Sequence, residues 1–378
     1  MKRSIWAGLS GAVCLSALAL SGAAASAAPR VELQTDPPLS QIEPFSEPVI
    51  FSLKAVADDG QPLEDAILEL LLNTPPKTPW LTTDFPVVEG TMLARLTLPA
   101  PQGEAQFQQV PPIRGSYQLQ VRVSPRVPGT FEPYTDLLTF QVPENPVKYR
   151  NLAILLSILL LAGLGGGWVI GGSQPPNPGE VASRPVQLVL SGTVLVAIAT
   201  LLYISITAER AGAHTEAPTG QDNYTEPLNA EPVPTNITAT LEDQAIATVG
   251  QAIPLEVELT RAETGEPISA AVLDINTTSL EYERTVFDFT AQTDTQGEFV
   301  WEQQFFDGAP HLVTVHVSPA ANSSIPFEPF EFSQRIDVTG VAPPLFVRLV
   351  SLGYCTGVLA LGTAAGFWLR RRSTQHAL

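Results

Sequence analysis

The sequence is short of the residues from which most catalytic and metal sites are built. Its 378 residues include only two cysteines, two methionines and four histidines. Cys14 lies in an N-terminal apolar run and Cys355 in the last apolar run, so the hydrophilic regions between the apolar runs contain no cysteine. These regions cannot be disulfide frameworks, and burial of apolar side chains must hold them together.

Familiar catalytic and cofactor-binding motifs are absent as well. There is no His-Glu-x-x-His, no phosphate-binding glycine loop with a lysine, no Gly-x-Ser-x-Gly elbow and no paired-cysteine motif. His311 and His316 lie five residues apart on one expected strand, so they should point to opposite faces and not share a metal. The acidic pairs at 58–59 and 64–65 flank an expected turn. They are either solvated hairpin ends or, less simply, an acid/base pair or calcium site. We expect no catalytic residue, metal or cofactor.

Positive charge is also scarce. The chain has 20 basic and 38 acidic residues, a formal net charge of −18. Residues 29–147 contain 15 acidic and 7 basic residues, and residues 207–342 contain 22 and 4. Such surfaces repel nucleic acid and anionic lipid head groups, so neither is an expected ligand. No motif indicates a small-molecule substrate, and the acidity is explained most simply by solubility outside the cytoplasm.

Long apolar segments, in contrast, are plentiful. Residues 5–20 follow Lys2 and Arg3 and precede the small residues at 25–28, which is the pattern of a cleaved secretory signal peptide. Three later segments are each close to the ~20 residues that a membrane-spanning helix needs. They comprise residues 151–171, 186–206 and 345–369.

The order of these segments predicts a topology. An exported first domain, an odd number of spans and the cluster Arg370-Arg371-Arg372 favour a cytoplasmic C-terminus, with both hydrophilic regions outside. We expect an integral protein of the plasma (inner) membrane of a bacterial envelope, with periplasmic domains. The predicted order is a signal peptide at 1–28, an exported domain at 29–148, a helix at 151–171, a cytoplasmic loop at 172–185, a helix at 186–206, a flexible exported linker at 207–235, an exported domain at 236–342, a helix at 345–369 and a cytoplasmic tail at 370–378.

The two hydrophilic regions repeat the same short motifs about 200 residues apart. The regular offset indicates a duplicated domain, and each copy is long enough to bury its own core. The matches are Gly60-x-Pro62 with Gly265-x-Pro267, Gly103-Glu104 with Gly297-Glu298, Val123-Ser124-Pro125 with Val317-Ser318-Pro319, and Phe131-Glu132-Pro133 with Phe327-Glu328-Pro329.

Apolar residues in both copies alternate with a period of two, which predicts antiparallel strands with one buried face. About seven short strands per copy, separated by Pro, Gly and Asp turns, indicate two β-sandwiches. The fold class is therefore all-β exported domains combined with three transmembrane helices. Strands are expected at 49–55, 66–72, 93–98, 117–123, 137–142, 253–259, 271–275, 286–291, 299–304, 311–317 and 331–338.

The turns of the second copy resemble bacterial immunoglobulin-like modules of the kind grouped with carboxypeptidase-regulatory-like domains. Gly265-x-Pro267 leads into the segment 270–272, and an Asp-x-x-Gly hairpin at 294–297 leads into Glu298-Phe299. The first copy keeps Gly60-x-Pro62 but has Pro-Gln-Gly-Glu at 101–104. The resemblance covers the two exported modules alone. It implies an immunoglobulin-like sandwich and a role in spacing, adhesion or partner binding without catalysis.

Two sets of residues are candidates for contacts. The aromatic residues of the repeated Phe-Glu-Pro segment either form the edge of a packed core or a patch that a partner recognises; they are Phe131, Tyr134, Phe327 and Phe330. Glycines at four-residue spacing either allow close helix packing or reflect the frequency of glycine in membrane helices. They are Gly163, Gly167, Gly171, Gly353, Gly357, Gly362 and Gly366.

Four functions fit these patterns. The first is a non-enzymatic membrane protein whose exported domains form a scaffold or partner-binding module for an envelope or membrane complex. The second is a surface adhesion or envelope-structure protein, the third is a sensor or transporter accessory subunit, and the fourth is an enzyme. The expected partners are the membrane and either another protein or a second copy of the chain.

Overall fold

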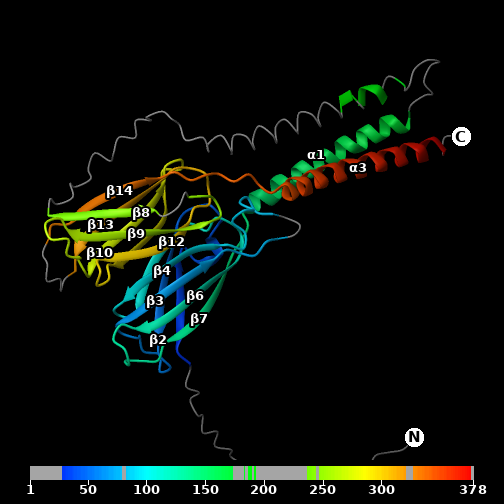
Figure 1. The fold of residues 1–378 in the computed structure, drawn as a ribbon. Coiled ribbons are helices and arrows are strands. Elements are labelled where there is room, and N and C mark those ends of the chain that lie inside the picture. The colour runs from blue at the N-terminus through cyan, green and yellow to red at the C-terminus, as the bar shows by residue number, and fades with distance from the viewer. Residues whose placement is uncertain are drawn as a thin grey trace, which may run out of the picture.

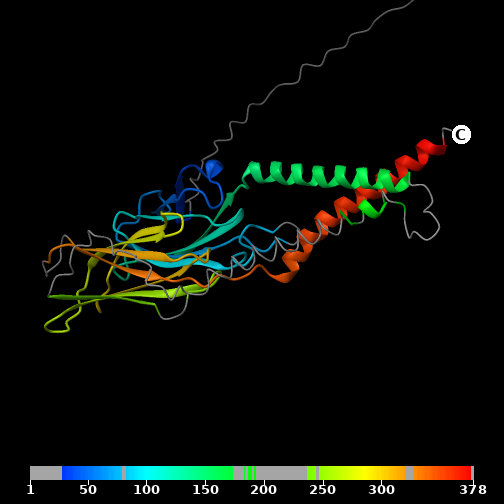
Figure 2. The same ribbon diagram turned by 90° about the horizontal axis from the view of Figure 1, so that it is seen from above.

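The computed structural model describes residues 28–78, 82–172, 183, 186–189, 191–192, 236–243, 247–320 and 327–375. This part of the chain forms two β-sandwiches, from which two long helices extend in the same direction (Figures 1 and 2). We call the sandwich of strands β1–β7 repeat 1 and that of strands β8–β14 repeat 2.

Each repeat has seven strands and is followed by one helix. Repeat 1 contains β1 (Arg30–Asp36), β2 (Val49–Val56), β3 (Ala66–Asn73), β4 (Met92–Ala100), β5 (Glu104–Gln109), β6 (Gly115–Pro125) and β7 (Tyr134–Val142), with a short 3-10 helix at Leu39–Gln41. Repeat 2 contains β8 (Ile237–Asp243), β9 (Ala252–Arg261), β10 (Ala271–Ser279), β11 (Arg284–Gln292), β12 (Glu298–Gln304), β13 (His311–Pro319) and β14 (Phe330–Ile336). The helices are α1 (Pro146–Gly171) and α3 (Leu345–Gln375).

The alternating pattern of the sequence produces the strands. In β6, every second side chain from Tyr117 to Val123 is at most 1 % exposed, while the residues between them face solvent. The eleven strands predicted from alternation are present. The prediction missed β1, β5 and β8. The strand β5 has only Ala105 and Phe107 as apolar residues, so it lacks the signal.

Both repeats have immunoglobulin-like strand order. In repeat 1, β1-β2-β5 forms one sheet and β7-β6-β3-β4 the other, so the fourth strand pairs with the third. Repeat 2 has the same arrangement. Near the start of β6, the Tyr117 hydroxyl donates to the Ile113 carbonyl oxygen at 2.7 Å and accepts from the Ile113 amide at 3.1 Å. This is the tyrosine corner of immunoglobulin-like sandwiches. The resemblance in the sequence is confirmed at the level of the fold.

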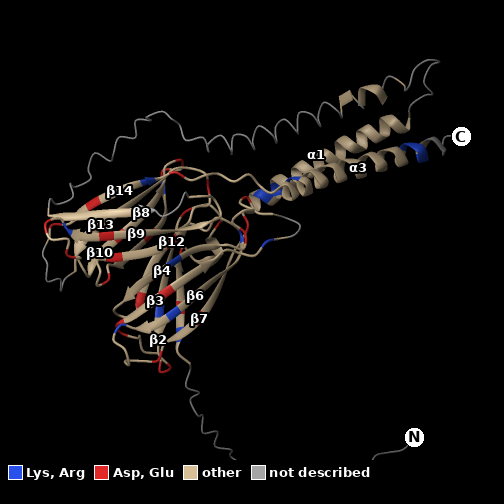
Figure 3. Ribbon diagram, in the orientation of Figure 1, with Lys and Arg blue, Asp and Glu red and all other residues tan. Residues whose placement is uncertain are grey.

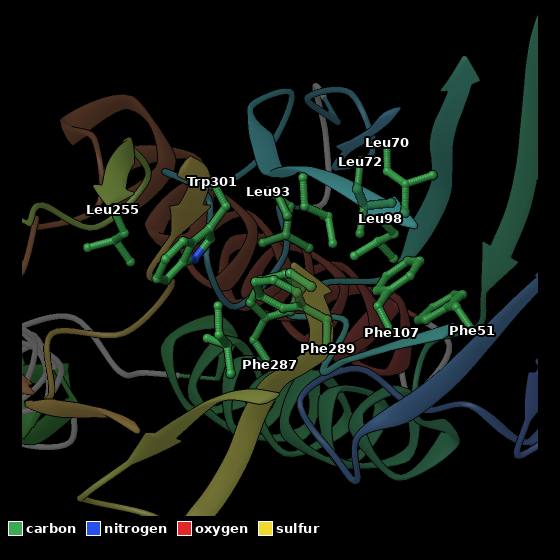
Figure 4. Close-up of a cluster of buried hydrophobic side chains, with 14 of the residues drawn as sticks. Phe51, Leu70, Leu72, Leu93, Leu98, Phe107, Leu255, Phe287, Phe289 and Trp301 are labelled. Carbon is green, nitrogen blue, oxygen red and sulfur yellow. The ribbon is translucent and has the colours of Figure 1, made fainter. Parts of the chain in front are cut away.

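The two repeats are joined edge to edge through both of their sheets. Strand β5 pairs with β11, where Phe107 lies opposite Phe289, and β4 pairs with β12, where Arg95 lies opposite Glu302. Each sheet therefore continues through seven strands, with three from one repeat and four from the other. Buried residues of both repeats form one hydrophobic cluster (Figure 4). The repeats are thus related as the halves of a two-fold dimer within one chain.

Two helices of the described residues are long and apolar enough to cross a membrane, namely α1 and α3. The first begins five residues before the predicted 151 because the Asn145 side chain caps it, accepting from the Val147 amide at 2.8 Å, and Pro146 suits the first turn. The predicted second span at 186–206 lies outside the described residues except for 186–189 and 191–192, which are helical. The predicted signal peptide and linker also lie outside them, save for residue 28.

Candidate functional site

The aromatic residues of the repeated Phe-Glu-Pro segment lie against the cores. Phe330 is 1 % exposed, so its ring belongs to the core of repeat 2. Phe131, Tyr134 and Phe327 are half-buried and pack against the same cluster. The Tyr134 hydroxyl donates to the Arg30 carbonyl oxygen at 3.0 Å, and burial raises the pKa of Tyr134 to about 12. The geometry gives these residues a packing role, and contact of the half-buried rings with a partner stays a prediction.

The predicted glycines fall into two groups. A Cβ added to Gly167 would overlap with the Thr363 carbonyl oxygen, and one added to Gly366 would overlap with the Leu164 carbonyl oxygen. The backbones of α1 and α3 are therefore in direct contact at these glycines. A Cβ added to Gly353 or Gly357 would meet no described atom within 4 Å. The glycines in contact across the helix pair are Gly163, Gly167, Gly171, Gly362 and Gly366.

The N-terminal end of α1 is bound tightly to repeat 1. Arg114 and Glu144 form an ion pair at 2.5 Å in which the Glu144 side chain is only 6 % exposed. The Asn145 amide donates to Glu43 at 2.7 Å, and Lys148 bonds to Asp84. The helix therefore continues rigidly from the sandwich. Lys148 therefore has a structural partner in repeat 1.

Arg284 of repeat 2 anchors the junction at the end near the helices. Its guanidinium donates to the carbonyl oxygens of Ser46 at 2.5 Å and Phe45 at 3.2 Å in repeat 1. It also stacks on the rings of Phe45 and Tyr282, at 4.5 and 5.3 Å from the centroids. Phe45 contacts Phe306 edge-on, with centroids 5.7 Å apart. One cation thus binds main-chain oxygens of repeat 1 and aromatic faces of both repeats.

This junction was not predicted from the sequence, although the sequence contains one signal for it. Arg284 is one of only four basic residues in the strongly acidic stretch 207–342. A rare cation at a strand start is a candidate for a structural role, but its partners lie more than 230 residues away in the chain. Gln304 of repeat 2 adds a bond to the Thr91 hydroxyl of repeat 1 at 2.8 Å. Val110 donates its amide to the Val286 carbonyl oxygen at 2.9 Å.

A buried titratable pair lies beside the junction. His311 is 0 % exposed, its Nδ1 lies 2.9 Å from the Ala309 carbonyl oxygen, and its Nε2 lies 3.4 Å from Asp307 Oδ1. Burial lowers the pKa of His311 to about 4 and raises the pKa of Asp307 to about 6. Because the lowered pKa keeps the His311 imidazole neutral at neutral pH, the pair is not a salt bridge despite the short distance. His316, in contrast, is half-exposed on the opposite face, as predicted.

The described residues contain no group of three or more His, Cys, Asp or Glu that could hold a metal ion. The acidic pairs at 58–59 and 64–65 are exposed around the turn that includes Gly60, and Asp59 accepts from the Gln61 amide at 2.9 Å. This is the geometry of a solvated hairpin end.

No protein-family model and no curated protein matches the sequence. Among solved structures, the chain is similar to the adhesin InvE of Yersinia pseudotuberculosis, with 10 % identity over 82 % of this chain and 58 % of InvE, and a TM-score of 0.20. It is also similar to the D0-D1 domain of intimin (9 % identity, 82 % and 97 % covered, TM-score 0.18).

A third similar structure is the alpha-2-macroglobulin of E. coli (10 % identity, 85 % of this chain and 14 % of that chain covered, TM-score 0.22). This chain therefore spans a little over half of InvE and a small part of alpha-2-macroglobulin. TM-scores this low carry no argument about function. The immunoglobulin-like fold follows from the strand order and the tyrosine corner of the chain itself.

Proposed function

We propose that this protein is a non-enzymatic membrane-anchored scaffold, whose fused double sandwich binds a protein partner in an envelope or membrane complex. The observation that carries the proposal is the edge-to-edge union of both repeats through both sheets. Arg284 and the aromatic rings at the junction add to this union, and the packed helices α1 and α3 hold both repeats at one end. Such a body offers a partner a fixed surface at a fixed height above a membrane.

The direction of the helices supports the three-span topology. Both α1 and α3 begin at the sandwiches and run the same way (Figures 1 and 2). If both cross the bilayer, the chain must return to the side of the sandwiches between Gly172 and Asn236, which takes an odd number of crossings. The apolar stretch 186–206 has the length for one crossing.

The ends of the helices support an orientation. Arg370 lies over the Trp168 ring at 5.1 Å and Arg372 over the Trp368 ring at 4.1 Å, at the far end of the helix pair (Figure 3). Tryptophan is enriched at both membrane interfaces, and a cluster of arginines is typical of the cytoplasmic one. Both sandwiches then lie outside the cytoplasm, and the membrane is the inner membrane.

The geometry supports a scaffold better than a surface adhesin. The repeats lie side by side and share one membrane anchor, so the exported part reaches about one strand length from the helices. The longest strand, β6, has 11 residues, which corresponds to about 36 Å at ~3.3 Å per residue. A protein that must reach another cell needs a longer arm, whereas a partner in the same envelope lies within this distance.

The proposal is tested by tagging the C-terminus, solubilising membranes in a mild detergent, and separating the tagged protein on native gels for mass spectrometry. A tagged membrane protein of similar size but without the sandwiches serves as the control. We expect a defined, stoichiometric partner that the control lacks. Migration of the protein alone would sink the scaffold proposal and favour envelope adhesion or sensing.

A further inference from the structure

The ladder that joins β4 to β12 stops after two residue pairs. Arg95 pairs with Glu302 and Ala94 with Gln303, both at the end nearer the helices. The same register would place Thr97 opposite Val300, but these residues are not paired. Pro99 gives a reason, because a proline within a strand lacks the amide that a neighbouring strand needs and marks an edge. Beyond Arg95 the two repeats diverge (Figure 1).

A cleft of about 370 Å³ opens where the ladder ends. The ion pair between Arg95 and Glu302, at 2.5 Å, closes it near the helices. At the far end, Arg126 donates to the Gln292 side chain at 3.0 Å across the two repeats. Pro99 lies four residues after Arg95 in β4. At ~3.3 Å per residue the cleft is about 13 Å long, which is the length of about four extended residues.

Main-chain groups of the β12 wall point into this cleft. The amide of Leu259 on β9 donates to the Gly297 carbonyl oxygen at 2.9 Å, which fixes the odd-numbered residues of β12 as the ones that bond β9. In an antiparallel strand alternate residues bond opposite neighbours, so Val300 directs its N–H and C=O towards β4. No strand of the described residues pairs with Val300 on that side. An open strand edge of this kind is a template for another strand.

The side chains around the cleft define the occupant further. Val300 is 50 % exposed, and Ile67 and Pro99 are half-buried on the opposite wall, so an apolar side chain fits between them. Asp294 and Glu298 also line the cleft. The pKa of Glu298 is raised, first by burial and then by Glu256, Asp294 and Glu258, which indicates an excess of negative charge. A basic residue in the occupant would neutralise it.

We propose that this cleft binds an extended segment of a partner protein, about four residues long, which pairs with the edge of β12 and has alternating β-branched residues and a flanking Lys or Arg. Strand addition gives affinity through main-chain hydrogen bonds and specificity through alternate side chains. The inference rests on the proposed scaffold role and names where the partner is held.

The test uses the full chain in lipid nanodiscs and a fluorescent peptide, Lys-Val-Thr-Val-Lys, with Lys-Val-Pro-Val-Lys as the peptide control. We expect the first peptide to bind in an anisotropy titration and the proline peptide not to bind. Val300→Pro removes the free amide without removing a bond to β9, and should weaken binding at least tenfold. Val300→Thr keeps the amide and should change binding less than twofold. Peptide binding should also slow hydrogen exchange in residues 298–301 of the unaltered protein.

The second measurement keeps the test decisive if Val300→Pro does not fold. Absence of peptide binding, equal binding to the Val300→Pro and Val300→Thr variants, or unchanged exchange at 298–301 would each overturn the proposal. A co-purifying partner that stays bound to Val300→Pro would also overturn it while leaving the scaffold role intact. Peptide binding that needs Val300 in a protein that travels alone on native gels would support the cleft and sink the scaffold role.

Discussion

Repeat 1 and repeat 2 share strand order and much of their register, yet they differ at the start of the sixth strand. In repeat 1 this position is Tyr117, whose hydroxyl satisfies both main-chain groups of Ile113. The residue 194 positions later is His311, which contacts the Ala309 carbonyl oxygen with one nitrogen and faces Asp307 with the other. The same backbone position thus closes a loop in one copy and holds a titratable pair in the other.

The same strand position therefore accepts either residue, and in both repeats a polar side-chain atom reaches a main-chain carbonyl oxygen that precedes the strand. Burial moves the pKa of Tyr117 upward, away from any physiological pH. It moves the pKa values of His311 and Asp307 into the range of mildly acidic pH. Both of these groups lie in repeat 2, which also contains Arg284, a side-chain contact to repeat 1.

The largest effect should come from separating the helices that the two repeats contribute. Gly366→Leu places a side chain where the Leu164 carbonyl oxygen of α1 already lies. We expect a loss of more than about 3 kcal/mol in the stability of the helix pair, measured by unfolding in detergent with circular dichroism. Gly357→Leu is the matched control, since a Cβ there meets no described atom within 4 Å. Equal loss in both variants would contradict the pairing.

The pH response of repeat 2 is the next effect in size. The folded pKa of Asp307 is raised from 3.8 to about 6, so its contribution to stability falls as pH rises through that range. The folded pKa of His311 is lowered from 6.5 to about 4, so its contribution rises with pH there. Each pKa shift corresponds to about 3 kcal/mol in the free energy of unfolding. In the unaltered protein the two contributions change with pH in opposite directions and partly cancel.

Single substitutions should therefore reveal opposite slopes. Asp307→Asn should become more stable as pH rises from about 4 to 6.5, and His311→Gln should become less stable from about 4 to 6. Urea unfolding followed by tryptophan fluorescence at several pH values measures both. Slopes of the same sign in the two variants would refute the opposite pKa shifts of Asp307 and His311.

The tyrosine corner of repeat 1 gives a smaller effect without pH dependence. Tyr117→Phe leaves the buried amide and carbonyl of Ile113 without their partner, at a cost of about 1–3 kcal/mol in the free energy of unfolding. Tyr134→Phe removes a hydroxyl bond that is exposed and should cost less. Urea unfolding should show the same loss of stability for Tyr117→Phe at pH 5 and at pH 8. A loss that changes with pH would contradict the difference between the two repeats.

The smallest effect should come from the exposed ion pair that joins β4 to β12. Arg95 and Glu302 have side chains that are 57 % and 28 % exposed, so solvent screens their attraction. Arg95→Met should cost less than about 1 kcal/mol in unfolding at low salt, and the cost should shrink further in high salt. A large, salt-independent loss would contradict the small contribution that we expect from an exposed ion pair at this junction.

Much of each repeat could be predicted from the sequence because its cause is local. Alternation in β6 and β13 gave the strands, and the repeated turn motifs gave the duplication. Strand β5 escaped prediction because its buried Gln109 lies at the junction, where burial depends on the other repeat. The sequence pattern could not decide between the two roles considered for Phe131 and Phe327, because aromatic residues suit both the edge of a packed core and a patch that a partner recognises.

Local patterns were enough to predict the sandwiches, the apolar helices and the acidity of the two hydrophilic regions, because periodicity, segment length and charge can be read within one segment of the chain. Only the folded chain shows that β5 meets β11, that β4 meets β12 only as far as Arg95, and that Arg284 binds Phe45 and Ser46. These contacts join residues about 180 to 240 positions apart. They form only after both sandwiches have folded, so no local sequence pattern predicts them.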